Sequence, residues 1–242
     1  MKLIQEKNVM TDTDHFNDFE TREALAAKLA DVIAGNLSVA ISRRGIATLA
    51  VSGGSTPKPL FRELSTREID WSRVSVTLVD ERWVPEDHID SNAALVRDNL
   101  LQGAARAANF VSMKIAGEDA FGARDGCERQ LADFANGIDV VVLGMGDDGH
   151  TASFFPGAAT LAEALDVESS RLCVAVKPPL APHDRMTLSL AVIKRSEHLY
   201  LHITGASKRE LLVQALQVDA VEELPIRTVA RCRSDMAVYC AP

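Results

Sequence analysis

The chain has 242 residues, of which 47% are hydrophobic, and its formal net charge at pH 7 is -8. This length and composition predict a single α/β domain over residues 1–242, with enough apolar side chains to build a sizeable core. A net acidic chain disfavours general nucleic-acid binding, because phosphate backbones are held by clustered excess Lys and Arg. Any anionic ligand would therefore have to be held by local cations.

Targeting and metal-binding signals are missing from the sequence. No segment has the apolar character of a signal peptide or the length of a membrane span, so we expect a cytoplasmic protein with no membrane partner. Two histidines, His198 and His202, are four residues apart, but they fall at the run 199–203, which is predicted to be a strand, so they do not form a helical metal site. We expect neither a metal nor a cofactor. The oligomeric state is left unknown. The cysteines form no C-x-x-C pair, which argues against a zinc knuckle and a disulfide framework: Cys127, Cys173, Cys232 and Cys240.

The first predicted element is an amphipathic helix between Phe19 and Ile41. Its apolar residues recur at spacings of three and four, as expected for a helix that covers one face of a sheet: Leu25, Leu29, Val32, Ile33, Leu37 and Ile41.

Six short apolar runs with β-branched residues follow and are predicted to be buried strands: 47–51, 74–79, 110–115, 140–143, 172–176 and 199–203. Helical patterns separate most of them: 60–64, 93–101, 127–134 and 207–216. This alternation predicts an α/β fold with a doubly wound, largely parallel sheet flanked by helices in three Rossmann-like layers. Ligands of such sheets bind beyond the carboxyl ends of the strands, so the loops that follow each run are the candidate sites.

The first such loop is Ser52-Gly-Gly-Ser-Thr-Pro57. Glycines let the backbone approach a ligand closely, and free amides before a helix suit an anion. The hydroxyl groups of Ser55 and Thr56 are further hydrogen-bonding partners. An ordinary capped turn between a strand and a helix is the alternative interpretation.

The second loop is Asp80-Glu-Arg-Trp-Val-Pro85, which leads through Asp90-Ser-Asn92 into the next helix. Asp80 could orient hydroxyl groups, and the guanidinium of Arg82 could pair with a phosphate. A solvated loop of salt bridges is the alternative, and Glu81 is interpreted as structural.

The third loop, residues 144–157, reads GMGDDGHTASFFPG. It contains a formal G-x-G-x-x-G pattern, but Pro156 and Gly157 would interrupt the crossover helix that a dinucleotide site requires, so that function is disfavoured. We favour a glycine-lined loop that presents Asp148 and His150 to the cleft, where the near-neutral pKa of histidine suits acid-base catalysis. Ser153 as a nucleophile is disfavoured because G-x-S-x-G is absent.

Two cations complete the candidate site: Arg185 in RMTLS, and Lys208 in TGASK. Lys208 would sit in the first turn of its helix, a position that disfavours a cation unless an anion is bound nearby. For each, an ordinary surface charge is the alternative.

Together these motifs resemble the 6-phosphogluconolactonases, within the wider group that includes glucosamine-6-phosphate deaminases and isomerases. The segments VSGGSTP, VDERWVP with SNAALVR, GMGDDGHTASFFPG, RMTLS and TGASK occur in that family's order and approximate spacing, over nearly the whole chain. The resemblance implies a NagB-type fold and the hydrolysis of 6-phospho-D-glucono-1,5-lactone without a metal.

The resemblance also implies roles for the candidate residues. His150 would activate a water as general base and Asp148 would tune its loop, whereas Asp80 and Arg82 would orient the sugar or its developing carboxylate. The phosphate would be held by Gly53, Gly54, Ser55, Thr56, Arg185 and Lys208.

Two other functions stay open at this point. A glucosamine-6-phosphate deaminase or isomerase would use a carboxylate at Asp80, but it would also have an acid shortly after the histidine loop, where this chain has Ser153-Phe-Phe-Pro156. Those deaminases also usually have an aromatic residue where this chain has Arg82. A non-catalytic sugar-phosphate sensor would need an appended DNA-binding module, for which the early first helix leaves no room.

Overall fold

The computed structural model describes residues 15–217 and 224–242. Most of the N-terminal stretch considered above for a signal peptide, residues 1–14, lies outside the described residues. All the strands and helices predicted from the sequence lie within the described residues.

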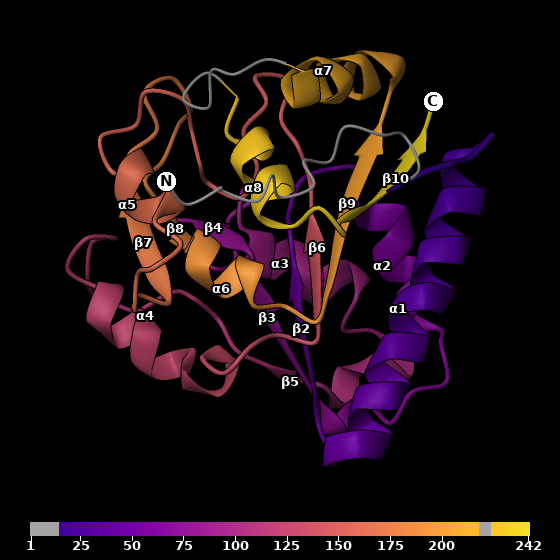
Figure 1. Cartoon of the computed structure of the whole chain (residues 1–242). Helices are drawn as coiled ribbons and strands as arrows, with labels where there is room; N and C mark the ends of the chain where they lie inside the picture. The colour runs from indigo at the N-terminus through magenta and orange to yellow at the C-terminus, as the bar shows by residue number, and fades with distance from the viewer. Residues whose placement is uncertain (1–14, 218–223) are drawn as a thin grey trace, which may run out of the picture.

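The described chain is organised around a parallel sheet of seven strands (Figure 1). Every pairing in it is parallel, which confirms the predicted doubly wound α/β class. In spatial order the strands are β1 (Phe16–Asp18), β10 (Ala237–Ala241), β9 (His198–Thr204), β6 (Val140–Leu143), β2 (Ala47–Val51), β3 (Val74–Leu78) and β5 (Asn109–Phe110).

Helices cover both faces of this sheet. In Figure 1, α1 and α2 lie on one side of it, and α6 and α8 lie on the other. The helices are α1 (Arg22–Arg44), α2 (Lys58–Ser65), α3 (Asn92–Asn99), α4 (Arg124–Gln130), α5 (Leu161–Leu165), α6 (Leu190–Lys194), α7 (Ala206–Gln217) and α8 (Ile226–Cys232).

Helix α1 shows how local sequence sets an element's ends. It begins after Thr21, whose side chain accepts a hydrogen bond from the amide of Ala24, and it ends at Gly45 in the left-handed conformation with φ 82°. By length and composition alone it is apolar enough to cross a membrane. Its apolar stripe is fully buried in the core, however, so α1 is a core helix: Leu25, Leu29, Ile33 and Leu37.

A second, antiparallel sheet of three strands is a feature that the sequence analysis did not predict. In it β4 (Asp80–Arg82) pairs with β8 (Arg185–Leu188), which pairs with β7 (Cys173–Val176). The run at 172–176 therefore belongs to this small sheet, outside the parallel one. The run at 110–115 is also shorter than predicted, since only Phe110 of it lies in β5.

The small sheet has a direct consequence for the candidate site. Strand β4 follows β3 after the single residue Val79, so the chain passes from the large sheet into the small one at Asp80. The register then places Arg82 directly across from Arg185. At the same edge, the carboxyl ends of β2, β6 and β9 bring together the 52–57 loop, the 144–157 loop and the segment that carries Lys208.

Candidate active site

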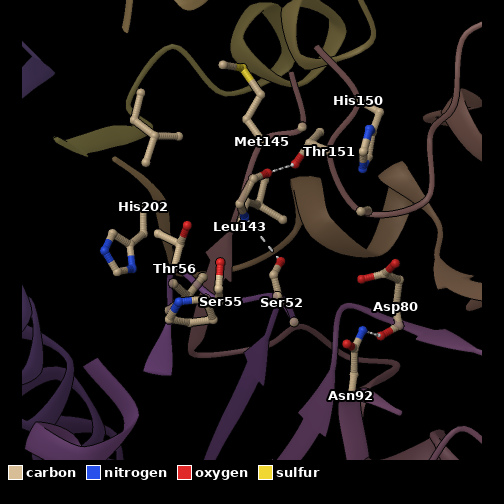
Figure 2. A pocket seen from close by; sticks show the side chains of 18 of the residues that line it. Ser52, Ser55, Thr56, Asp80, Asn92, Leu143, Met145, His150, Thr151 and His202 are labelled. Atoms are coloured by element: carbon tan, nitrogen blue, oxygen red, sulfur yellow. Dashed lines mark hydrogen bonds between the residues drawn. The ribbon is translucent and has the colours of Figure 1, made fainter. Parts of the chain in front are cut away.

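A cavity lies at the carboxyl edge of the parallel sheet, and Figure 2 shows the side chains around it. Every predicted site residue lines it except Asp148, which is hydrogen-bonded to His150, and Arg185, which is paired with Arg82 in the small sheet. The lining comprises residues 52–57, 142–146 and 150–152 together with Asp80, Arg82, Asn92, His202, Ile203 and Lys208.

The 52–57 loop forms one wall of the cavity. Ser52 ties it to the neighbouring loop by accepting a hydrogen bond from the amide of Gly144 at 3.2 Å. A side chain at Gly53 is excluded, because a Cβ there would lie 1.8 Å from Oδ1 of Asn92. Within the described residues, the amides of Gly54, Ser55 and Thr56 have no hydrogen-bond partner, so this wall presents free donors just before α2, as an anion requires.

His150 is held by the carboxylate of Asp148. Oδ1 of Asp148 accepts from the ring nitrogen Nδ1 of His150 at 2.5 Å and from the His150 amide at 3.2 Å. Burial by itself would raise the pKa of Asp148, but the charge and hydrogen bonds of His150 outweigh it and the pKa is lowered. An ionised Asp148 fixes the proton on Nδ1, which leaves Nε2 as an acceptor that can take a proton from water.

Close packing keeps the His150 ring in this orientation. On one side a Cβ at Gly146 would approach the ring to 2.2 Å, so only glycine fits there. On the other side the ring of Phe155 lies with its centroid 4.3 Å away. The loop itself is closed by hydrogen bonds from the Gly146 amide to the His150 carbonyl at 2.8 Å and from the Thr151 hydroxyl to the Gly144 carbonyl at 2.7 Å.

Asp80 reaches the same cavity from β4. Its Oδ2 accepts a hydrogen bond from the hydroxyl of Ser153 at 2.6 Å, and its backbone carbonyl accepts from Nδ2 of Asn92 at 2.8 Å. The Ser153 side chain is completely buried. A buried hydroxyl engaged in this way positions Asp80, and this agrees with the sequence analysis, which disfavoured Ser153 as a nucleophile.

Glu81 has the structural task expected of it. Its buried carboxylate accepts from the amides of Arg82, Asn92 and Ala93 and from the hydroxyl of Ser91. The donors from Ser91, Asn92 and Ala93 open helix α3, so Glu81 caps that helix from a neighbouring strand. Burial raises the pKa of Glu81, although all four hydrogen bonds act to lower it.

Two guanidinium residues are paired across the small sheet, Arg82 in the lining of the cavity and Arg185 outside it. Nη1 of Arg82 donates to the carbonyl of Asp90 at 2.7 Å. Arg185 is only 6% exposed, which rules out the surface-charge alternative, and its guanidinium lies 5.8 Å from the Phe155 ring centroid. Burial and then the charge of Arg82 lower the pKa of Arg185. Its Nε and Nη1 have no protein partner within the described residues, so an anion beside this pair would stabilise both.

Lys208 lies in the first turn of α7, as predicted. Its Nζ donates to the carbonyl of Met145 at 2.7 Å and is 3.6 Å from a carboxylate oxygen of Asp147. These contacts aim the ammonium group across the 144–157 loop, so it lines the cavity and is not an ordinary surface charge.

Asn92, Ser153 and His202 belong to the site but were not among the predicted residues. Asn92 was noted only as the start of a helix, Ser153 only as an unlikely nucleophile, and His202 was assigned no special context. Asn92 and Ser153 act on residues far away in the chain, and no local pattern signals that. His202 had one signal, its position at the end of an apolar strand.

Two other kinds of site were considered in the sequence analysis, a dinucleotide-binding site and a metal site. After β6, the first α-helix is α5, only five residues long and beginning at Leu161, so the G-x-G-x-x-G pattern opens no crossover helix and is not a dinucleotide fingerprint. In the part of the chain that the structure describes, no three His, Cys, Asp or Glu side chains are grouped so as to hold a metal ion.

The sequence of this chain is similar to those of known proteins. The family model described as glucosamine-6-phosphate isomerases/6-phosphogluconolactonase matches residues 20–238. A 6-phosphogluconolactonase of Rhizobium meliloti (strain 1021) is 47% identical over 225 residues, covering 93% of this chain and 97% of that protein. One of Mesorhizobium japonicum is 50% identical over 198 residues, covering 81% and 82% respectively.

Solved structures agree with these sequences. A crystal structure of a 6-phosphogluconolactonase from Shewanella baltica OS155 superposes with a TM-score of 0.92 at 44% identity and covers 97% of this chain and 100% of that one. A monomeric glucosamine-6-phosphate deaminase of the NagB superfamily has a TM-score of 0.76 at 19% identity, covering 93% and 96%, so it shares the fold.

Proposed function

Because this chain belongs to the glucosamine-6-phosphate isomerase/6-phosphogluconolactonase family, we propose that it hydrolyses 6-phospho-D-glucono-1,5-lactone to 6-phosphogluconate, a step of the pentose phosphate pathway. The observation that carries this proposal is the His150–Asp148 pair at the cavity, where a carboxylate fixes the imidazole with one nitrogen free for water.

The chemistry needs only one activated water. Nε2 of His150 takes a proton from a water that attacks the C1 carbonyl, and a tetrahedral intermediate forms. When the bond between C1 and the ring oxygen breaks, the imidazolium returns that proton to the departing oxygen, so the histidine is regenerated. A lactone is an activated ester, and general-base catalysis of about 10²–10⁴-fold combined with orientation of the water suffices without a metal or a covalent intermediate.

The remaining site residues divide between the two ends of the substrate. The free amides and hydroxyls of Gly54, Ser55 and Thr56, with Gly53 allowing the close approach and Lys208 supplying charge, suit the phosphate. The unpartnered guanidinium atoms of Arg185 suit an anion, but this residue is paired with Arg82, and the phosphate contact that the resemblance implied for it stays a prediction. Asp80, held by Ser153, and Arg82, held by the Asp90 carbonyl, orient the sugar hydroxyls or the carboxylate that forms.

The experiment follows acid release from freshly prepared 6-phosphogluconolactone against its spontaneous opening, with ammonia release from glucosamine 6-phosphate as a parallel assay. We expect accelerated lactone opening, unchanged by a chelator, and no ammonia. Ammonia without lactone hydrolysis would identify the deaminase reaction with Asp80 as its base, and no turnover of either compound would favour a sensor. His150→Ala should abolish most turnover and still bind 6-phosphogluconate.

The cellular setting follows from the same proposal. We propose a soluble cytoplasmic enzyme whose partner is a phosphorylated small molecule. The net charge of -8 supports the absence of a nucleic-acid partner, and the buried apolar stripe of α1 supports the absence of a membrane one.

A further inference from the structure

His202 is a polar side chain of the cavity that the proposed mechanism does not use. It lies near the end of β9, in register with Tyr239 on β10, and is only 4% exposed. It lines the cavity together with Ser55 and Thr56. In the view of Figure 2 it lies toward these two residues, on the opposite side of the picture from His150 and Asp80. His202 therefore borders the 52–57 loop and is remote from the general base.

The hydrogen-bonding capacity of this imidazole is not used by the residues that the structure describes. Burial lowers the pKa of His202 to about 4, so the ring is neutral at physiological pH and carries one N–H donor and one acceptor nitrogen. Nδ1 is buried and has no partner within residues 15–217 and 224–242. A polar side chain that lines a cavity, and whose hydrogen-bonding groups the described residues leave unused, is available to a molecule bound there.

The burial of Nδ1 leaves Nε2 as the nitrogen that can meet an occupant of the cavity. The occupant nearest to it would be the anion held by the 52–57 loop, where three further donors are free. An anion accepts hydrogen bonds, so it selects the tautomer with the proton on Nε2. The neutral ring adds a donor to the charge that Lys208 supplies, without adding a further cation.

We propose that His202 donates a hydrogen bond from Nε2 to the substrate's phosphate and thereby helps the enzyme to select phosphorylated over unphosphorylated lactones. This inference rests on the proposed function. By this inference, His202 contributes to substrate selection together with the 52–57 loop and Lys208.

Kinetics on two substrates test the inference. For His202→Leu we expect KM for 6-phosphogluconolactone to rise about tenfold with kcat nearly unchanged, which is the loss of one hydrogen bond to a charged group. The rate with unphosphorylated glucono-1,5-lactone should not change. His202→Gln, whose amide nitrogen can reach the position of Nε2, should restore most of the affinity, whereas the shorter His202→Asn should not. His198→Leu is the matched control, since His198 is on the same strand, two residues from Tyr200 and outside the cavity, and should leave both substrates unaffected.

Direct binding separates this inference from the proposed function. Titration with inorganic phosphate should show about tenfold weaker binding to His202→Leu than to the unaltered protein, whether or not the chain hydrolyses lactones. Equal losses on both lactones, or unchanged KM and phosphate binding in a folded His202→Leu protein, would overturn the inference. If His202→Leu does not fold, the contrast between the Gln and Asn variants decides, and equal phosphate affinity in those two would overturn it as well.

Discussion

Asp148 lies directly behind His150, with its Oδ1 2.5 Å from Nδ1 of the imidazole and outside the lining of the cavity. The carboxylate thus acts on the histidine and not on a ligand. The acid binds one ring nitrogen and leaves the other free, and this gives the site its direction, because it decides which nitrogen faces the substrate.

Replacing Asp148 by Asn should lower kcat by about 10- to 100-fold with KM nearly unchanged, because the ring loses its fixed tautomer while the cavity wall stays intact. Steady-state kinetics measure the split between the two constants. Asp147→Asn is the control, since the Asp147 carboxylate is largely exposed, faces Lys208 and should leave kcat unaltered. A normal kcat in Asp148→Asn would remove the orienting role.

Gly146→Ala should fold normally and yet lose most of its turnover. The added Cβ would lie 2.2 Å from the His150 ring, and the ring, as a side chain, has to move away from the position that Asp148 sets. Gly144→Ala, in the same loop, meets nothing closer than 3.9 Å and should retain activity. Circular dichroism checks the fold of both variants, and equal kcat values in the two would contradict the packing argument.

Glu81→Gln should lower the free energy of unfolding by about 2 kcal/mol, because three donors at the start of α3 and the amide of Arg82 lose a carboxylate acceptor. For a chain of this length the melting temperature should then fall by roughly 4–8 °C. Asp87→Asn, in the same loop but exposed, provides the comparison. An unchanged melting temperature in Glu81→Gln would show that the cap contributes little.

The pKa of about 4 for His202 predicts a dependence of stability on pH. Its ordinary value is 6.5, so between these two values the unfolded chain binds a proton that the folded chain does not. The contribution is fully present above pH 6.5 and is lost as the pH falls to about 4, by up to roughly 3 kcal/mol. Burial raises the pKa of neighbouring Tyr239, which therefore stays neutral throughout.

Urea unfolding of the unaltered protein and of His202→Leu at pH 7 and near pH 4 measures this effect. The unaltered protein should lose more stability on acidification than the variant, because leucine cannot bind the proton. His198→Leu should follow the unaltered protein. Parallel pH profiles for all three would show that His202 is protonated in the folded state as readily as in the unfolded one.

The local chemistry of the strands and of the glycine-rich loops could be predicted from the sequence alone. The runs at 47–51 and 140–143 have the bounds of β2 and β6, because continuous apolar residues can only be buried in the centre of such a sheet. The ends of α1 were predicted about three residues too early, since the capping by Thr21 and Gly45 decides them. Strand β10 was missed because Ala237–Ala241 is short and joins the sheet only through β9 and β1, which are distant in the sequence.

The sequence by itself determined which residue types stand after which strands, and through them the candidates His150, Asp80, Arg82 and Lys208. Only the tertiary structure decided which side chains act on them, because those contacts join segments far apart in the chain. The hydroxyl of Ser153 donates a hydrogen bond to Asp80, 73 positions away in the sequence, and Asn92 packs against Gly53 from the start of helix α3. Likewise, His202 became a candidate only when the sheet buried its ring beside the 52–57 loop, since desolvation and missing partners are properties of the folded surroundings.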